Sequence, residues 1–354
     1  MTDRADFELE GVDLCDLCGS SRSRLFEVYV RYGTSFNLVE CEECGLAYVT
    51  PRPTQETIGS FYDLDYEDSR HGWVQPTWKR PVTATLRELL AARYSSSAVS
   101  RTLARCVLPW ELKWRSILRT NHLSSIATIG RVLDVGCGHG AWLATMRRWG
   151  FDCVGCEPDP IAVRAASASG MNVVQSDLLG AGFRDGEFDV VRFSNVLEHV
   201  HNPTAVLTEA CRVTKPGGIV VIVVPNHESL IAQAFRQVED VPRHLFSFAP
   251  RTLRRYLEKV GLTMLESSTE TREPHMVYSQ FVSPAVDCLR DVRVADNDGA
   301  VNCVDAFFAF RNRRRNREYR RTAAVMDALG LGRMAVVVGG RGLRRDVPDK
   351  GPGA

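Results

Sequence analysis

The stretch from Arg131 to Gly140, with the sequence RVLDVGCGHG, constrains the fold of this chain more than any other. An apolar run leads into glycines at 136, 138 and 140, and a helical pattern follows over 141–149. Because glycine has no Cβ atom, a ligand can approach the backbone closely, and the amides that open the helix point at that ligand. The order of strand, glycine turn and helix therefore predicts a loop that binds a nucleotide-containing cofactor.

The glycine spacing alone leaves two kinds of nucleotide-binding fold open. Gly136, Gly138 and Ala141 also satisfy the G-x-G-x-x-G/A fingerprint of dinucleotide-binding proteins. Asp134, however, lies two residues before the first glycine, inside a strand that is ordinarily apolar in such proteins. An acidic residue at this position indicates that the strand end has a polar role.

Two more acidic residues end the next two predicted strands. Glu157 ends the second strand and Asp177 ends the third. Each carboxylate alone is equally compatible with an ordinary strand-end or helix-capping residue. Three of them in register behind one glycine loop favour a ligand-binding edge instead. The segments 187–200 and 215–226 then supply a fourth and a fifth apolar strand.

These five ordered motifs resemble those of the class I S-adenosylmethionine-dependent methyltransferases over about residues 128–270. The similarity is to the subgroup that includes the ubiquinone-biosynthesis O-methyltransferase and many sugar and natural-product methyltransferases. It implies an α/β, Rossmann-like core with a seven-stranded sheet, in which the last strand runs antiparallel. The best candidate for that strand, 334–338, comes long after the sixth strand, so we expect a helical insertion at about 272–332.

The resemblance also implies where S-adenosylmethionine lies. Asp134 and the three glycines are expected under its methionine and ribose parts, and Glu157 is expected to accept hydrogen bonds from both ribose hydroxyls. Asp177 is expected to bind the adenine amino group, with Leu178 beside the ring. The full predicted cofactor set, of which the last two members border the methionine end, is Asp134, Gly136, Gly138, Gly140, Glu157, Asp177, Leu178, Ser194 and Asn195.

A second strong signal is a pair of C-x-x-C motifs, formed by Cys15 with Cys18 and by Cys41 with Cys44. Their separation is close to that of tetrathiolate zinc sites, and the residues between them predict strands with a turn at Gly33. Two disulfides are the alternative, but no secretory leader accompanies them. We therefore expect one structural zinc ion. The other seven cysteines are expected to be core residues, at 106, 137, 153, 156, 211, 288 and 303.

Composition adds limits on the class of protein. A chain of 354 residues with 44% hydrophobic residues can bury one full α/β core and carry smaller units. The longest apolar run, 219–225, is far shorter than a membrane span, so we expect a cytoplasmic protein without a membrane partner. A net charge of +1 gives no global bias toward nucleic acid.

The chain divides into three predicted parts, which are a zinc-ribbon module at 1–50, a helical linker or lid at 51–125 and the methyltransferase core at 126–345. The lid is a candidate surface for a homodimer. Tyr62 or Tyr66 could close over cofactor or acceptor, although packing between domains is a slightly simpler role for both.

The predicted insertion carries seven arginines between 311 and 321. On a helix, four of them fall on one face, which could bind a phosphate-bearing acceptor. A solvated basic helix is the simpler alternative. The four are Arg313, Arg317, Arg320 and Arg321.

Two histidines are candidate general bases. His199 follows the fourth strand and His244 lies beyond the fifth, both at the sheet edge where open α/β folds bind ligands. His244 is preferred because His199, beside Glu198, could equally fix the loop from within. The ubiquinone O-methyltransferase group has a Glu-x-x-Glu-His metal motif here, but this chain has Asn195 in place of the first carboxylate, which argues against magnesium dependence. The weaker candidates are His201, His227 and His275.

The function predicted from these patterns is methyl transfer to a hydroxyl of a small polar acceptor, such as a sugar, a nucleotide-linked glycosyl unit or a secondary metabolite. Carbon methylation of a deoxysugar stays open, although those enzymes usually carry a much larger carboxyl-terminal domain. An RNA base methyltransferase is disfavoured because the cysteine module is acidic. A non-enzymatic scaffold is disfavoured because the predicted cofactor residues are intact.

Overall fold

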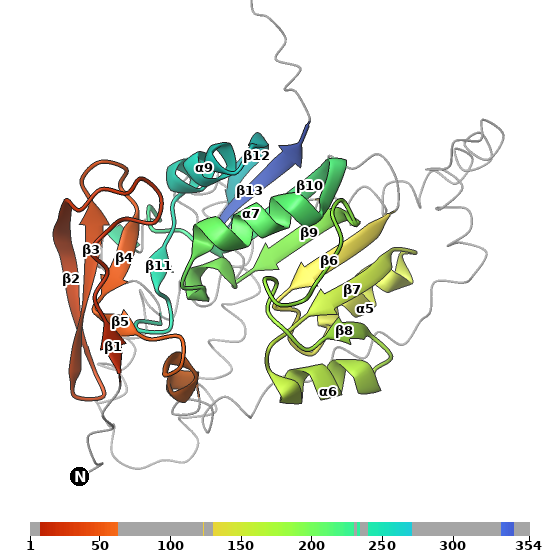
Figure 1. Cartoon of the computed structure of the whole chain (residues 1–354), viewed down its shortest axis with the longest axis horizontal. Helices are drawn as coiled ribbons and strands as arrows, with labels where there is room; N and C mark the ends of the chain where they lie inside the picture. Colours follow the sequence, from red (N-terminus) through yellow and green to blue (C-terminus); the bar gives the residue numbers. More distant parts are fainter. Residues whose placement is uncertain are drawn as a thin grey trace, which may run out of the picture.

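The computed structural model describes residues 8–62, 123, 130–229, 232–233, 240–270 and 334–342 (Figure 1). Most of the expected helical lid and the whole expected insertion lie outside these ranges. The same is true of Tyr66, His275, the arginine-rich stretch and three of the cysteines, at 106, 288 and 303.

A seven-stranded mixed sheet forms the core, in the order β12-β13-β10-β9-β6-β7-β8. All neighbouring pairs are parallel except those that involve β13. The chain runs from β6 outward to β7 and β8, and then crosses to the other side of β6 with β9 and β10. The strand order therefore reverses next to β6, at the point where open α/β sheets bind ligands. The strands are β6 (Arg131–Val135), β7 (Asp152–Cys156), β8 (Asn172–Val174), β9 (Phe188–Ser194), β10 (Thr214–Pro225), β12 (Leu262–Glu270) and β13 (Met334–Arg341).

The late antiparallel strand predicted at 334–338 is confirmed as β13, which extends to Arg341. It inserts between β10 and β12, so that Val337 faces Ile222 on one side and Ser267 on the other. Its first seven residues are all buried, because both its neighbours and the layers above and below cover it. A strand buried on both faces has a continuous apolar run rather than an alternating pattern, which is why it was recognisable in the sequence.

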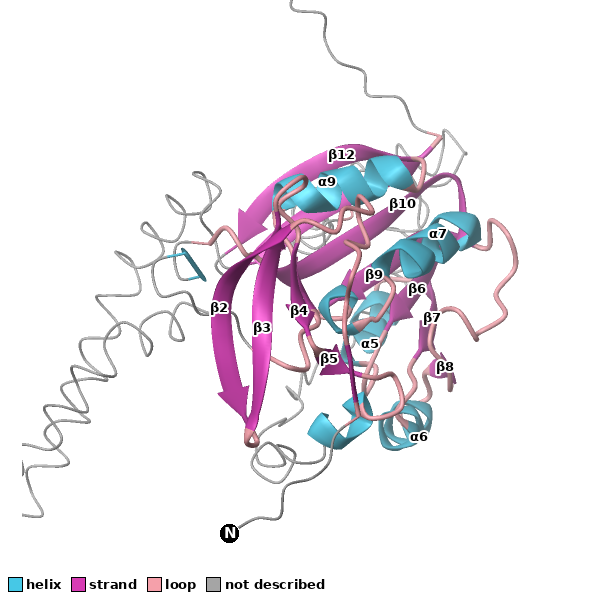
Figure 2. Ribbon diagram, turned by 60° about the vertical axis from the view of Figure 1, so that its left-hand side comes forward, coloured by secondary structure: helices cyan, strands magenta, loops and turns pink. Residues whose placement is uncertain are grey.

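Helices cover both faces of this sheet. Apolar side chains of α7 (Pro203–Val213) and α9 (Pro250–Lys259) pack in one buried cluster, whereas those of α5 (Ala141–Arg148) pack in another with the opposite sides of the same strands. Figure 2 shows α7 and α9 running together over their face of the sheet. Two further elements are the helix α6 (Pro160–Ala168) and a short 3-10 turn, η1 (Leu197–His199), and helical residues also occur at 58–62 and 232–233.

The amino-terminal module is a four-stranded antiparallel sheet in the order β11-β4-β3-β2. The predicted strands around Gly33 are confirmed as β2 (Ser23–Arg31) and β3 (Thr34–Cys41), and Gly33 has a positive φ of 73° in the turn. The third strand is β4 (Ala47–Thr50). The fourth, β11 (Phe246–Ser247), comes from the core, and Figure 1 shows it running beside β4.

The module also packs directly on the core. Leu17 and Leu46, which flank the cysteines, belong to the same buried cluster as Leu253 and Tyr256 of α9. A further short pair of strands, β1 (Leu9–Glu10) and β5 (Arg52–Pro53), extends past the boundary expected at residue 50. Among the described residues, no helix has the length and apolar character that a membrane crossing needs.

Candidate functional site

The glycine loop has the backbone conformation that its sequence predicts. Gly136, Gly138 and Gly140 all have positive φ angles, of 62°, 51° and 76°. This left-handed region disfavours side chains, so all three positions favour glycine. A Cβ atom on Gly136 would also lie 2.6 Å from Cγ2 of Val196, whereas one on Gly138 would meet nothing within 4 Å. The open side of Gly138 leaves its backbone accessible to a ligand.

Glu157 is fixed against this loop. Its Oε2 accepts a 2.9 Å hydrogen bond from the amide of Gly138, and its Oε1 accepts one of 3.0 Å from the amide of Asp159. Each carboxylate oxygen can accept a second hydrogen bond, so the group retains acceptor capacity while its orientation is set. The arrangement fits a carboxylate that receives two hydroxyl donors.

Asp134 makes an interaction that the sequence reasoning missed. Its Oδ1 pairs with Nη1 of Arg192 at 2.6 Å, and the two residues are register partners on β6 and β9. Burial raises the pKa of Asp134, and the Arg192 guanidinium opposes that rise. The signal available in the sequence was an arginine inside the otherwise apolar run 190–193.

The other predicted cofactor residues occupy the same carboxyl edge. Asp177 is exposed after β8 and accepts a 2.8 Å hydrogen bond from the amide of Gly180, while Leu178 is buried in the core. Ser194 ends β9, and Asn195 has a positive φ of 54° and donates its amide to Val223. The structure therefore brings the ends of β6, β7, β8 and β9 into one continuous rim.

The two candidate bases lie side by side. The ring centroids of His199 and His244 are 4.6 Å apart in an edge-to-face arrangement. Nδ1 of His199 lies 3.1 Å from the carbonyl oxygen of Arg243 and 2.9 Å from the hydroxyl of Tyr62. A carbonyl only accepts, so the tautomer in which His199 bonds to Arg243 has its proton on Nδ1 and Nε2 as its acceptor nitrogen.

Glu198 lies close to this pair and is 1% exposed. Neither of its carboxylate oxygens has a hydrogen-bond partner among the described residues, and burial raises its pKa to about 8. Ligand atoms of Glu198, His199 and His244 lie within 4.8 Å of one another, a spacing at which three such groups could share a cation. The sequence predicted His199 and His244 but assigned no role to this carboxylate.

The weaker histidine candidates have contacts of their own. Nε2 of His201 lies 2.9 Å from the carbonyl oxygen of Pro53, and Nδ1 of His227 lies 3.2 Å from the hydroxyl of Ser247. Burial is the main cause that lowers the pKa of both rings. These contacts tie the two histidines to β5 and β11 rather than to the His199 ring.

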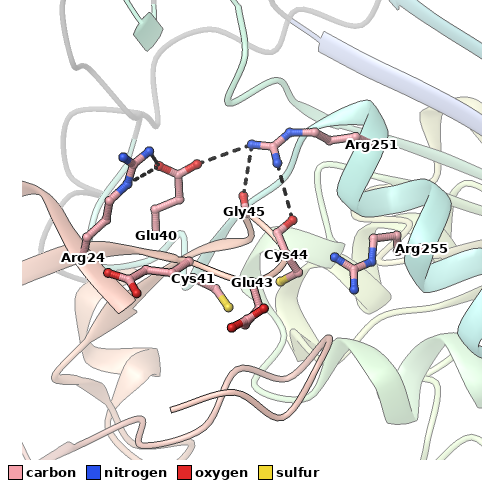
Figure 3. Close-up of a pocket in the computed structure, with 9 residues that line it drawn as sticks. Arg24, Glu40, Cys41, Glu43, Cys44, Gly45, Arg251 and Arg255 are labelled. Carbon is pink, nitrogen blue, oxygen red and sulfur yellow. Dashed lines mark hydrogen bonds and ion pairs between the residues drawn. The ribbon is translucent and has the colours of Figure 1, made fainter. Parts of the chain in front are cut away.

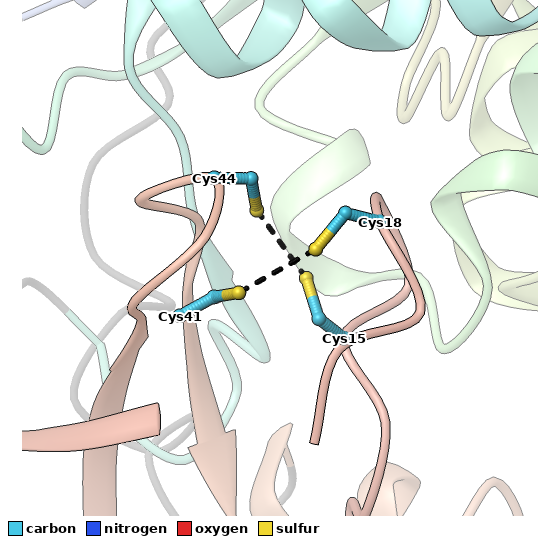
Figure 4. Close-up of side chains that lie close together, drawn as sticks. All are labelled: Cys15, Cys18, Cys41 and Cys44. Carbon is cyan, nitrogen blue, oxygen red and sulfur yellow. Dashed lines mark hydrogen bonds between the residues drawn. The ribbon is translucent and has the colours of Figure 1, made fainter. Parts of the chain in front are cut away.

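The four predicted metal-ligating cysteines come together at one point (Figure 4). Their sulfur atoms all lie within 4.8 Å of one another, and Sγ of Cys15 is 3.5 Å from that of Cys44, as is Sγ of Cys18 from that of Cys41. The hydrogen bond from Cys44 is the main cause that lowers the pKa of Cys15, to about 5. Four convergent sulfurs with a stabilised thiolate fit a tetrahedral zinc site.

Both cysteine knuckles are fastened to core helices. In the first, Oδ2 of Asp16 accepts hydrogen bonds of 2.7 Å from the hydroxyls of Thr204 and Tyr256. In the second, Arg251 of α9 reaches the carbonyl oxygens of Cys44 and Gly45 at 3.4 and 3.5 Å, as Figure 3 shows. The polar pocket in that view is lined by Arg24, Glu40, Cys41, Glu42, Glu43, Cys44, Gly45, Arg251 and Arg255.

Comparison with known proteins supports the core assignment. Residues 93–267 match the methyltransferase domain family. Over 93 residues the chain is 43% identical to an uncharacterized methyltransferase of Mycobacterium sp. (strain JLS), a match that covers 26% of this chain and 37% of that protein. Over 100 residues it is 41% identical to a ubiquinone biosynthesis O-methyltransferase of Cereibacter sphaeroides, which covers 26% of this chain and 39% of that protein.

A solved structure of an S-adenosylmethionine-dependent methyltransferase from Archaeoglobus fulgidus resembles the chain with a TM-score of 0.41 and 20% identity, over 64% of this chain and 91% of that one. The chain spans well under half the length of the curated relatives above. The domain match and the strand order together give the core the class I methyltransferase fold.

Proposed function

We propose that this protein is an S-adenosylmethionine-dependent methyltransferase that acts on a hydroxyl of a small polar acceptor, such as a sugar, a nucleotide-linked glycosyl unit or a secondary metabolite. The single observation that carries the proposal is the Glu157 carboxylate held on the amide of Gly138, beside three glycines with positive φ. That geometry offers acceptor atoms and an accessible backbone at the point where a ribose would meet the sheet.

The remaining cofactor residues follow from their places on the rim. Asp177 would receive the adenine amino group beyond β8, and Ser194 and Asn195 would border the methionine end beyond β9. The glycines at 136, 138 and 140 would let the middle of the cofactor lie against the backbone. S-adenosylmethionine, when bound, supplies an already activated methyl group, so the protein has to align the acceptor and remove its proton.

His199 and His244 are the proposed bases. The Arg243 carbonyl favours the tautomer of His199 in which Nε2 can take a proton, while Nε2 of His244 lies 3.8 Å from Oδ2 of Asp240. These contacts favour His199 as the proton acceptor, a reversal of the preference drawn from the sequence. His244 would then pack against the reactive ring, and the hydroxyl of Tyr62, 2.9 Å from Nδ1 of His199, would help to hold that ring.

Calorimetric titration with S-adenosylmethionine tests the cofactor assignment. Glu157→Ala should abolish or severely weaken binding, because the ribose hydroxyls lose their acceptor pair. Glu258→Ala is a matched control, since this carboxylate lies on the exposed side of α9 and pairs only loosely with Arg254. Tight binding of NADH in place of S-adenosylmethionine would overturn the proposal.

The acceptor class is tested separately, by screening hydroxylated sugars, nucleotide-linked sugars and phenolic metabolites for methyl transfer and locating the new methyl group by NMR. A methyl group on oxygen supports the proposal, and one on carbon supports the deoxysugar alternative. An activity that appears only with added magnesium and is lost with a chelator would mean that Glu198, His199 and His244 hold a cation. That result would overturn the base assignment.

We also propose that Cys15, Cys18, Cys41 and Cys44 hold one structural zinc ion. The convergence of the four sulfurs supports this site. A phosphate-bearing acceptor and a homodimer through the lid stay predictions, because the segments that suggested them lie outside the described residues.

A further inference from the structure

We propose that Arg192 binds the carboxylate of the methionine part of S-adenosylmethionine. The inference rests on the proposed function, since it needs that cofactor at the glycine loop. Arg192 lies outside the glycine-loop motif, and its proposed ligand is one group of the cofactor, the amino-acid carboxylate.

The guanidinium of Arg192 is held by the two residues that flank the glycine loop. On one side it pairs with Asp134, two residues before Gly136, at 2.6 Å. On the other side its Cζ lies 4.6 Å from the ring centroid of Trp142, two residues after Gly140. A single charged group therefore bridges the strand that enters the loop and the helix that leaves it.

The ion pair is too deeply placed to be an ordinary surface contact. The side chains of Arg192 and Asp134 are 14% and 4% exposed, and their neighbours at the next inward positions, Val190 and Val132, are fully buried. An apolar pair would generally serve a core of this kind as well as or better than an ion pair. A charge retained at this depth beside a ligand loop favours a role in binding.

Arg192 also has unused hydrogen-bonding capacity. A guanidinium carries five N–H donors. Of these, one on Nη1 is directed at Asp134, and no other acceptor for Arg192 is found in the described part of the chain. A partly buried cation with free donors is a site for an anion, and the fork of an arginine matches a carboxylate in particular.

The position of the ribose site gives the direction of the cofactor. Glu157 directly follows β7, and β9 lies on the opposite side of β6. A cofactor whose ribose lies at Glu157 and whose chain crosses the glycine loop therefore brings its amino-acid end toward β9. Arg192 is the charged side chain that β9 directs to the loop from that side.

The test compares two ligands that share the adenosine and sulfur atoms. S-adenosylhomocysteine carries the amino-acid carboxylate, and 5′-methylthioadenosine lacks the whole amino-acid group. Dissociation constants for both are measured by calorimetry in Asp134→Asn and in Asp134→Asn/Arg192→Met. The Asp134→Asn change, common to both variants, avoids leaving a buried carboxylate without its cation, and it removes any difference due to Asp134 itself.

We expect the added Arg192→Met change to weaken the binding of S-adenosylhomocysteine by about 10- to 100-fold, because charge-assisted hydrogen bonds to its carboxylate are lost. The affinity for 5′-methylthioadenosine should not change, so the preference between the two ligands should collapse. Equal weakening of both ligands, or an unchanged affinity for S-adenosylhomocysteine, would overturn the inference. Circular dichroism confirms that each variant is folded.

Arg192→Lys in the otherwise native chain is the second variant, since it keeps the charge beside Asp134 and removes the planar fork. Arg192→Lys should weaken the binding of S-adenosylhomocysteine but not that of 5′-methylthioadenosine, and by less than Arg192→Met does. If the native protein binds neither ligand, the proposed function itself fails, a result distinct from an unchanged preference between two ligands that do bind.

Discussion

The carboxylate of Asp16, between Cys15 and Cys18, accepts a 2.7 Å hydrogen bond from the hydroxyl of Tyr256 on α9. The same oxygen accepts a second 2.7 Å bond from Thr204 at the start of α7. Lys259, one turn beyond Tyr256, reaches the backbone carbonyl of Asp16 at 2.6 Å. One residue of the cysteine module thus holds two core helices together.

Replacing this anchor should destabilise the whole chain rather than the module alone. We expect Asp16→Ala to lower the free energy of unfolding by about 1–3 kcal/mol, because partly buried hydroxyls lose a charged acceptor. Urea denaturation, monitored by tryptophan fluorescence, measures this free energy of unfolding. Asp13→Ala is the control, since Asp13 is exposed in the same segment. Equal stability of the two variants would contradict the anchoring role.

Zinc loss should follow from removal of a single thiol. Metal analysis of freshly purified protein should find one zinc per chain, and Cys41→Ser should release it and loosen the module, since thiolate ligation couples metal binding to folding. Cys211→Ser is the matched control, because this partly buried cysteine lies on α7 outside the cluster. A native protein without zinc would count decisively against the site.

A side chain at Gly136 should abolish cofactor binding. Gly136→Val adds both the strain of a positive φ and a clash with Val196. Gly182→Val shares the strain, with a φ of 67°, but meets no atom within 4 Å of its Cβ. Calorimetry should therefore show S-adenosylmethionine binding lost in the first variant and kept in the second. Retained binding in Gly136→Val would place the cofactor elsewhere.

The base assignment predicts a large loss of turnover with cofactor affinity retained. His199→Ala should lower kcat by roughly 100-fold or more, as expected for the loss of a general base. His244→Ala should have a smaller effect if that ring mainly supports His199. The kcat of each variant is measured from the rate of product formation with the native acceptor. Near-normal turnover in both variants would mean that alignment alone drives the transfer.

The pH profile offers an independent check on His199. Burial lowers its pKa below the ordinary value, so the neutral, proton-accepting form persists to lower pH than in a free histidine. The rate should therefore fall only as the pH drops through this lowered value, which puts the acid limb of kcat/KM below about 6.5. An acid limb above that pH would point to a different base.

The features that the sequence predicted well depend on residues close together in the chain. The glycine loop, the strands around Gly33 and the late strand at 334–338 each have a local pattern of small, turn-forming or continuously apolar residues. The two cysteine pairs were equally readable, because chemistry fixes their spacing. The sequence also predicted that His199 and His244 lie at the same edge of the sheet, since both follow carboxyl ends of strands, but it did not predict that their rings touch.

The features that it missed depend on pairings between distant residues. Arg192 meets Asp134 only because β9 and β6 lie side by side in register. The carbonyl of Arg243 orients His199 through a backbone atom, which has no signature in a sequence. In the same way, β11 has only two residues and therefore gives no strand pattern of its own. Its pairing with β4 requires the folded core.

That short strand determines how such a protein can be recombined. Phe246 and Ser247 complete the sheet of the cysteine module, and they begin two residues after His244. Leu245 lies between that histidine and the strand, and its amide donates to the carbonyl of Glu198 at 2.8 Å. A chimera that exchanged residues 8–53 alone would place a foreign edge against this strand and shift the histidine pair. The unit that can be exchanged is therefore discontinuous. We expect that residues 240–248 have to be transferred together with residues 8–53 if the module and the histidine pair are to keep their structures.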